Sequence, residues 1–234
     1  QMTELYHVFI EKKYPEDWDQ DWREHAHESL GLFLVQYLCN GFNLADAARL
    51  VYDDHYFKSG KKSFRFIRKK TEDRSDTEIV IPIIEPLQKI LDEIAAKPEK
   101  GALVFPQIYA GETDENKQKA RISQENQNIR KRLGRLVKSM GWEVAPSGTW
   151  CRHSFATNLS HAGGVPKEYI QEAMGHSVMS GTITDRYIQS YPIDQQMEFN
   201  SRLLKLNDDA DIMEELKGLT PEQLKALIAM VKNV

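Results

Sequence analysis

The spacing of apolar residues predicts a chain that is mainly helical. Over residues 22–39 apolar side chains recur every three to four positions, as they do in a long buried helix. These positions are Leu30, Phe33, Leu34, Tyr37 and Leu38. Asn40 and Gly41 break the helix, and Asn43 is a good N-cap for a short helix over residues 44–51.

One segment has a period of two instead. Apolar and polar residues alternate over residues 64–68 and again over 78–82, on either side of the polar stretch 72–76. Such alternation around a polar turn predicts a β-hairpin. A single small antiparallel sheet among many helices corresponds to the α+β class, with helix predominating.

Start and stop signals divide the rest of the chain. Ser123 is a candidate cap for a basic helix that Gly141 ends, and residues 106–122 before it predict a polar loop. Thr220 to Gln223 has the form of a capping box with Pro at the first helical position. Further helices are expected over residues 87–96, 123–140, 152–161, 166–174, 183–190, 194–204 and 221–232.

The charge is unevenly distributed. The chain has 234 residues and a formal net charge of −4, from 31 basic and 35 acidic side chains. Basic residues nevertheless crowd two segments, 58–74 and 117–138. A single basic run is usually a solvated face, but an acidic protein can present a basic face to phosphates.

Other features of composition exclude several classes of protein. The most apolar stretch, residues 30–38, is too short to span a bilayer, and no secretory signal is visible. Cys39 and Cys151 form neither a metal-binding spacing nor a disulfide framework, which suits a reducing cytoplasm. We therefore expect a cytoplasmic protein that has no metal centre and does not contact a membrane.

Three short motifs follow one another between residues 149 and 191. Arg152 begins the string RHSFAT, His176 lies in MGHS, and Tyr187 follows. A guanidinium has paired donors that match two phosphate oxygens, and an imidazole can donate to an oxygen or move a proton. A phenol held in line and deprotonated forms a covalent ester. Together these groups predict phosphoryl transfer without a metal.

The order of these motifs resembles the active site of the tyrosine recombinase (phage integrase) family. The resemblance covers roughly residues 20–205. The string CNGFNLAD, which starts at Cys39, is similar to integrases of Bacteroides-type mobile elements. The resemblance implies DNA cleavage and rejoining through a 3′-phosphotyrosine, with no cofactor.

The resemblance also implies a role for each matching residue. Tyr187 is the nucleophile, Arg152 and His176 hold the non-bridging oxygens, and Lys70 protonates the leaving oxygen, with Lys69 as an alternative. Two positions depart from the family pattern, because Asn43 replaces an Arg and Thr149 replaces a His. The side chains that could supply the missing donors are Arg49, Arg65, Arg68 and His153.

Alternative interpretations stay open at this level. Tyr191 is a second candidate nucleophile, and His153 fits a structural role better than a catalytic one. Taken singly, Arg152 fits a surface salt bridge, Lys70 a turn residue and His176 a helix cap. The two departures also allow a catalytically impaired DNA-binding protein, and a type IB topoisomerase-like enzyme would share the chemistry.

The resemblance finally implies an organisation and partners. Residues 1–206 are expected to form the catalytic domain, without the N-terminal DNA-binding domains, and 207–234 an acidic linker and amphipathic helix. The expected partner is double-stranded DNA in the nucleoid of the bacterial cytoplasm, bound by a homotetramer. The C-terminal helix either docks in trans on the neighbouring protomer or folds back on its own domain. DNA contacts are predicted at Lys62, Arg65, Arg68, Lys69, Arg130, Lys131 and Arg135.

Overall fold

The computed structural model describes residues 1–67, 78–175 and 190–204. The predicted hairpin turn, the helix at 183–190 and the C-terminal helix lie outside these ranges, as do Lys70, His176 and Tyr187. The chain separates into two units, residues 1–203 and 204–234, and the description below concerns the first.

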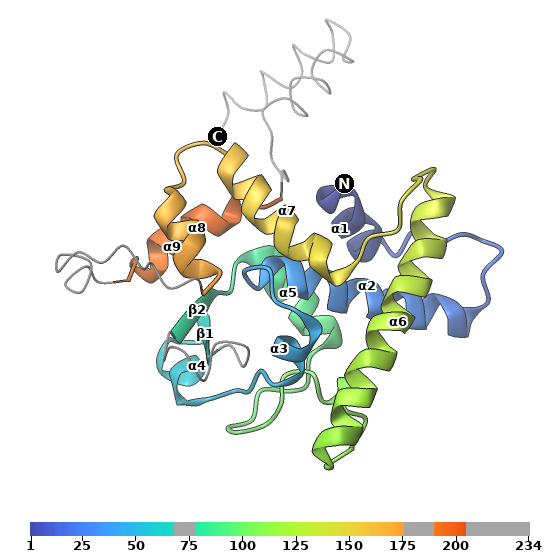
Figure 1. Ribbon diagram of the computed structural model, residues 1–234, viewed down its shortest axis with the longest axis horizontal. Coiled ribbons are helices and arrows are strands. Elements are labelled where there is room, and N and C mark those ends of the chain that lie inside the picture. Colours follow the sequence, from blue (N-terminus) through green and yellow to red (C-terminus); the bar gives the residue numbers. More distant parts are fainter. Residues whose placement is uncertain (68–77, 176–189, 205–234) are drawn as a thin grey trace, which may run out of the picture. The chain divides into compact units, whose positions relative to one another are not determined.

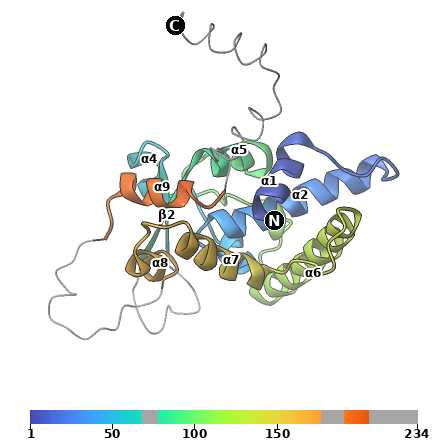
Figure 2. The same ribbon diagram turned by 90° about the horizontal axis from the view of Figure 1, so that it is seen from above.

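The first unit is mainly helical and contains one hairpin (Figures 1 and 2). This confirms the predicted fold class. Its elements are α1 (Met2–Glu11), α2 (Gln20–Leu38), α3 (Leu44–Ala48), α4 (Asp54–Lys58), β1 (Ser63–Ile67), β2 (Glu78–Pro82), α5 (Glu85–Ile94), the 3-10 turn η2 (Pro106–Ile108), α6 (Glu115–Ser139), α7 (Gly148–His161), α8 (Lys167–Ala173) and α9 (Ile193–Ser201).

Helix α2 lies at the centre of the hydrophobic core. Every residue from Ser29 to Leu38 is buried, so the second half of this helix is covered on all sides. Helices α1, α5, α6 and α7 contact it, and Figure 1 shows them around it. In the described ranges, no helix combines the length and the apolar character needed to cross a membrane.

The hairpin is antiparallel, with Arg65 opposite Val80. Phe64 and Phe66 point into the core, whereas Arg65 and Ile67 are exposed, as the predicted alternation requires. Helix α4 packs against β1, while α8 and α9 pack against β2. The two strands therefore join the N-terminal half of the unit to its last helices.

Several helix boundaries differ from the prediction. Helix α6 begins at Glu115, because Asp114 caps it by accepting a hydrogen bond from the Lys117 amide (2.9 Å), so the predicted loop was wrong over residues 115–122. Helix α7 begins four residues earlier than expected, at Gly148. The helix after Asn43 ends at Ala48, and the following backbone pairs with another segment of the chain.

Candidate functional site

Arg152 contacts the backbone next to two other predicted motif positions. Its Nη2 donates to the carbonyl oxygen of Met174 (3.1 Å), and its Nη1 to that of Gly41 (3.5 Å). Met174 ends helix α8 two residues before His176, and Gly41 comes two residues before Asn43. The half-buried guanidinium is thus held between the loop that carries Asn43 and the backbone that leads to His176.

Two glycines near these contacts have conformations that favour glycine. Gly41 has φ +69°, and a Cβ at this position would lie 2.9 Å from the Cα of Arg152. Gly175 has φ +65°, and a Cβ there would lie 2.5 Å from Cδ1 of Ile79. Both the left-handed conformation and the contact exclude a side chain. Glycine is therefore favoured at position 41 for its contact with Arg152, and at position 175 for its backbone conformation and its contact with Ile79.

Asn43, the residue in place of the family's Arg, is the N-cap of α3. Its Oδ1 accepts from the Asp46 amide (2.8 Å), and a carboxylate oxygen of Asp46 accepts from the Asn43 amide (3.4 Å). The two residues form a capping box, which confirms the predicted cap. The side chain of Asn43 therefore has a structural use, and it carries no charge.

Arg49, at the other end of α3, lies beside the same loop. Its Nη2 lies 3.3 Å from Oδ1 of Asp46, and its guanidinium carbon is 5.2 Å from the centre of the Phe66 ring. The Phe66 ring in turn packs at 4.8 Å on Phe42, which follows Gly41 directly. These contacts fix a cation on the helix that Asn43 begins.

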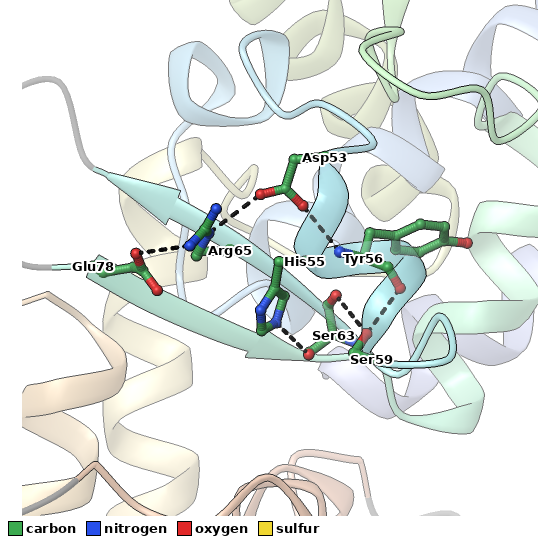
Figure 3. A network of polar contacts seen from close by, with 7 residues as sticks. All are labelled: Asp53, His55, Tyr56, Ser59, Ser63, Arg65 and Glu78. Carbon is green, nitrogen blue, oxygen red and sulfur yellow. Dashed lines mark hydrogen bonds and ion pairs between the residues drawn. The ribbon is translucent and has the colours of Figure 1, made fainter.

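Arg65 is placed differently. It makes ion pairs with Asp53 (3.3 Å) and Glu78 (3.5 Å) at the exposed face of the hairpin. Figure 3 shows these pairs beside a second set of hydrogen bonds that joins His55, Ser59 and Ser63. Two carboxylates thus offset the positive charge of Arg65, which the sequence analysis had predicted to contact DNA.

Thr149 and His153 lie on α7 close to Arg152. Thr149 is three residues before Arg152 and therefore on the same side of the helix, where it is exposed in the first turn. His153 is adjacent in sequence, so it projects about 100° further round the helix, where it is exposed. Of the two, Thr149 is the better placed to share a ligand with Arg152.

Tyr191 is built into an aromatic cluster. Its ring lies 5.3 Å from that of Tyr169 and 5.9 Å from that of Phe199. Its backbone N–H donates to Glu172, and its carbonyl accepts from Gln196 Nε2 (2.6 Å). Burial, followed by the neighbouring carboxylates of Glu168 and Glu172, raises the pKa of Tyr191. The phenolate form is therefore disfavoured.

The predicted DNA-binding residues of α6 have different surroundings. Arg135 stacks over Trp18 (4.9 Å) and Trp22 (5.0 Å), and Lys131 lies over Trp22 (5.8 Å). Both cations remain exposed, and the sequence analysis did not anticipate their aromatic partners. Stacking restricts the Arg135 side chain while its N–H groups can still meet a phosphate. The exposed Arg130, and Lys62 at the start of the hairpin, are further available cations.

Several predicted residues lie outside the described ranges, so their placement is not tested. They are Lys70, His176, Tyr187, Arg68 and Lys69. Within the described ranges, no group of His, Cys, Asp or Glu side chains is arranged to hold a metal ion. Cys39 and Cys151 are both buried, and burial raises the pKa of each thiol.

Comparison with known proteins identifies the class. The sequence profile of the phage integrase family matches residues 24–192, and the chain belongs to this family of tyrosine recombinases. One similar solved structure is the crystal structure of XerA recombinase, with 14% sequence identity and a TM-score of 0.40. The similarity covers 89% of this chain and 66% of that one. No curated protein sequence matches the chain.

Proposed function

We propose that this chain is the catalytic part of a site-specific DNA recombinase that works through a covalent 3′-phosphotyrosine at Tyr187. The observation that supports this most is the position of Arg152. Its guanidinium is held by the carbonyl oxygens of Gly41 and Met174, between two other motif positions of the family. Donors fixed in this way are what a phosphoryl-transfer site needs.

The proposed reaction has two exchanges. The Tyr187 oxygen attacks the scissile phosphorus, the bond to the 5′-oxygen breaks, and Lys70 supplies the proton to that oxygen. Arg152 and His176 stabilise the charge on the non-bridging oxygens. A 5′-hydroxyl of a partner duplex then attacks the phosphotyrosine and releases the phenol. Each step replaces one phosphate ester by another, so the reaction needs no energy-rich cofactor.

The surroundings of Tyr191 favour Tyr187 as the nucleophile. Tyr191 packs against Tyr169 and Phe199 and has a raised pKa. A phenol that must attack phosphorus has to lose its proton and reach the phosphate. Packing and two nearby carboxylates therefore weigh against Tyr191 as the nucleophile. The order of the family motifs is the reason that we propose Tyr187, four residues earlier.

Arg49 is the best-supported substitute for the family's missing Arg. The absence of one charged donor to the transition state typically costs about 2–4 kcal/mol. Among the described alternatives, Arg49 is paired with one carboxylate, that of Asp46, whereas Arg65 is paired with two. His153 projects from a different side of α7 than Arg152. Arg49 belongs to the helix that Asn43 caps, and Thr149 adds a hydroxyl in place of the missing His.

The wider organisation is also part of the proposal. Residues 1–206 form the catalytic domain, and 207–234 an acidic linker and a helix that docks on the neighbouring protomer. Double-stranded DNA is bound through the exposed cations of α6 and the hairpin, by four protomers on two duplexes. The resemblance of the string at Cys39 to integrases of Bacteroides-type mobile elements supports a bacterial host. The DNA of its nucleoid is the proposed substrate.

A covalent-trapping experiment tests the proposal. A pool of nicked duplexes with randomised core sequence is incubated with the protein, so that cleavage near the nick releases a short strand and traps the adduct. Detergent-resistant complexes are isolated, the DNA is sequenced, and the linked peptide is mapped by mass spectrometry. We expect the DNA-linked residue to be Tyr187 and the adduct to be lost in Tyr187→Phe. We also expect a shared core sequence among the captured duplexes.

The same experiment addresses the two alternatives. The departures at Asn43 and Thr149 favour a catalytically impaired DNA-binding protein as second candidate, which would retain DNA without any covalent adduct. A type IB topoisomerase-like enzyme would relax supercoiled plasmid as a monomer and would capture DNA without a shared core sequence. A phosphopeptide that contains Tyr191 would contradict the assignment of the nucleophile.

A further inference from the structure

A chain of buried polar side chains joins α9 to the loop that holds Arg152. Nδ2 of Asn200, in α9, donates to Oδ1 of Asn40 (2.9 Å), which follows α2. The hydroxyl of Tyr169, in α8, donates to Oδ1 of Asn200 (2.7 Å). Both asparagines are fully buried, at 0% exposure. Buried amides of this kind are costly to leave unpaired, so their partners define one arrangement of the elements that carry them.

Asn40 has a specific place in this chain of contacts. It adopts a left-handed conformation, with φ +56°, and its Nδ2 donates to the carbonyl oxygen of Val80 in β2 (3.0 Å). Its side-chain amide therefore makes two hydrogen bonds: the nitrogen donates to the hairpin and the oxygen accepts from α9. An Asn in this backbone conformation is held by its side-chain bonds.

The next residue is the one that contacts the arginine. Gly41 follows Asn40 directly, and its carbonyl oxygen accepts from Nη1 of Arg152 (3.5 Å). The Gly41 carbonyl belongs to the next peptide unit, in which the Phe42 N–H donates to the Cys39 carbonyl oxygen (3.1 Å). Asn40 and this peptide unit are therefore parts of one hydrogen-bonded turn, so a displacement of Asn40 also displaces the Gly41 carbonyl. The position of this turn, and with it the Gly41 carbonyl, thus depends on the bonds that Asn200 and Val80 make with Asn40.

We infer that Asn200 is a positioning residue that orients Arg152 through Asn40 and Gly41. The inference rests on the proposed function, in which Arg152 binds the scissile phosphate. Helix α9 follows the proposed nucleophile in sequence. When α9 is packed in place, Asn200 holds Asn40 and Arg152 is oriented at the same time. A protomer whose α9 is displaced would therefore bind DNA with a misdirected Arg152.

The test uses Asn200→Asp, which keeps the side-chain shape and an oxygen for the Tyr169 hydroxyl. It removes the donor to Asn40 and places a carboxylate against an amide oxygen. Asn200→Ala removes the same donor without adding charge, in case the first variant does not fold. Phe199→Leu, on the same helix, is the control for a general loss of α9 packing, because its ring contacts Tyr169 and Tyr191 rather than Asn40.

Cleavage is measured in a single turnover on two forms of the captured duplex. One has the ordinary scissile phosphate, and the other a methylphosphonate, which lacks one negative charge and so depends less on an arginine. We expect Asn200→Asp and Asn200→Ala to slow cleavage of the phosphate roughly tenfold to a hundredfold. Their cleavage of the methylphosphonate is expected to change little, and the same pattern is expected for Arg152→Ala. Phe199→Leu lowers both rates in equal proportion.

A second readout needs no catalysis. The side-chain Nε–Hε resonance of Arg152, assigned from Arg152→Lys, is compared in DNA-free protein. It shifts in both Asn200 variants and stays in place in Phe199→Leu. Equal slowing on both substrates, or an unshifted Arg152 resonance, overturns the inference. Absence of any adduct with the unaltered protein refutes the proposed function instead, while the resonance still decides the role of Asn200.

Discussion

The ring of Tyr191 meets that of Tyr169 edge to face, with centroids 5.3 Å apart and planes at 77°. This contact joins the segment after the proposed nucleophile to α8. Aromatic pairs of this geometry typically contribute about 0.5–1.5 kcal/mol beyond the burial of apolar area. The relationship makes Tyr191 a packing residue in the described fold, with consequences that mutation can separate from catalysis.

We therefore expect opposite results from the two tyrosines. Tyr191→Phe keeps the ring and retains covalent DNA attachment, whereas Tyr191→Ala loses about 1 kcal/mol or more of unfolding free energy. Denaturant unfolding and trapping on nicked DNA measure the two effects. Loss of the adduct in a stably folded Tyr191→Phe protein would assign the nucleophile to Tyr191.

Arg152→Lys tests the demand for a guanidinium. Lysine keeps the charge but lacks the paired donors that reach two oxygens, so cleavage is expected to fall about 10²–10³-fold while DNA affinity changes little. The adjacent His153→Ala is the control, since this exposed side chain projects away from Arg152. Single-turnover cleavage and equilibrium binding are measured in parallel, and a comparable loss in His153→Ala would contradict the assignment.

DNA binding is expected to depend steeply on salt despite the acidic composition. Each neutralised phosphate contributes a slope of about −0.9 to log affinity against log salt concentration. Arg135→Ala removes an exposed cation stacked on Trp18 and Trp22, and the slope decreases by about one phosphate. Arg132, paired with Glu125 (3.6 Å) and Ser29 (3.0 Å), is the matched control. A flat salt response would exclude a basic DNA-binding face.

Glu172 predicts a pH effect on stability. Burial raises its pKa, while hydrogen bonds from the Ser190 side chain and the Tyr191 backbone lower it less strongly. The folded protein thus holds the proton more tightly than the unfolded chain does. The resulting stabilisation is present below the ordinary pKa of 4.5 and is lost as pH rises through the raised value.

Glu172→Gln is accordingly expected to be more stable than the parent protein near neutral pH and equally stable in acid. Glutamine can still accept both hydrogen bonds, so the difference reports charge. Thermal unfolding between pH 4 and pH 8 measures it, with the exposed Glu168→Gln as control. A stability difference that is independent of pH would show that the Glu172 carboxylate is not disfavoured by burial.

Substitutions at Asn43 can distinguish its effect on stability from an effect on DNA cleavage. Asn43→Ala is expected to lower the unfolding free energy by about 1 kcal/mol. Asn43→Asp keeps the cap but brings a negative charge toward the proposed phosphate, so stability is retained and cleavage falls. Unfolding curves and single-turnover rates distinguish the two. Unchanged cleavage in Asn43→Asp would show that this position does not face the phosphate.

The features that the sequence determined by itself are local ones. Apolar periodicity predicted α2, alternation predicted the hairpin, and the residue type of Asn43, placed before an apolar run, predicted a cap that the bond from the Asp46 amide confirms. The start of α6 was missed although its signal is equally local, since Asp114 caps it. Backbone preferences and caps depend on near neighbours, so a short window of sequence contains them.

The tertiary structure alone decided which remote side chains meet. Asn40 and Asn200 are 160 residues apart in the chain, and no periodicity connects them. In the same way Asp53 and Glu78 offset the charge of Arg65, and Trp18 and Trp22 receive Arg135. The motif order identified Arg152, but only packing showed that the carbonyls of Gly41 and Met174 hold it. Such pairs form because distant elements pack together, and their energies depend on burial and distance in three dimensions, which residue order does not specify.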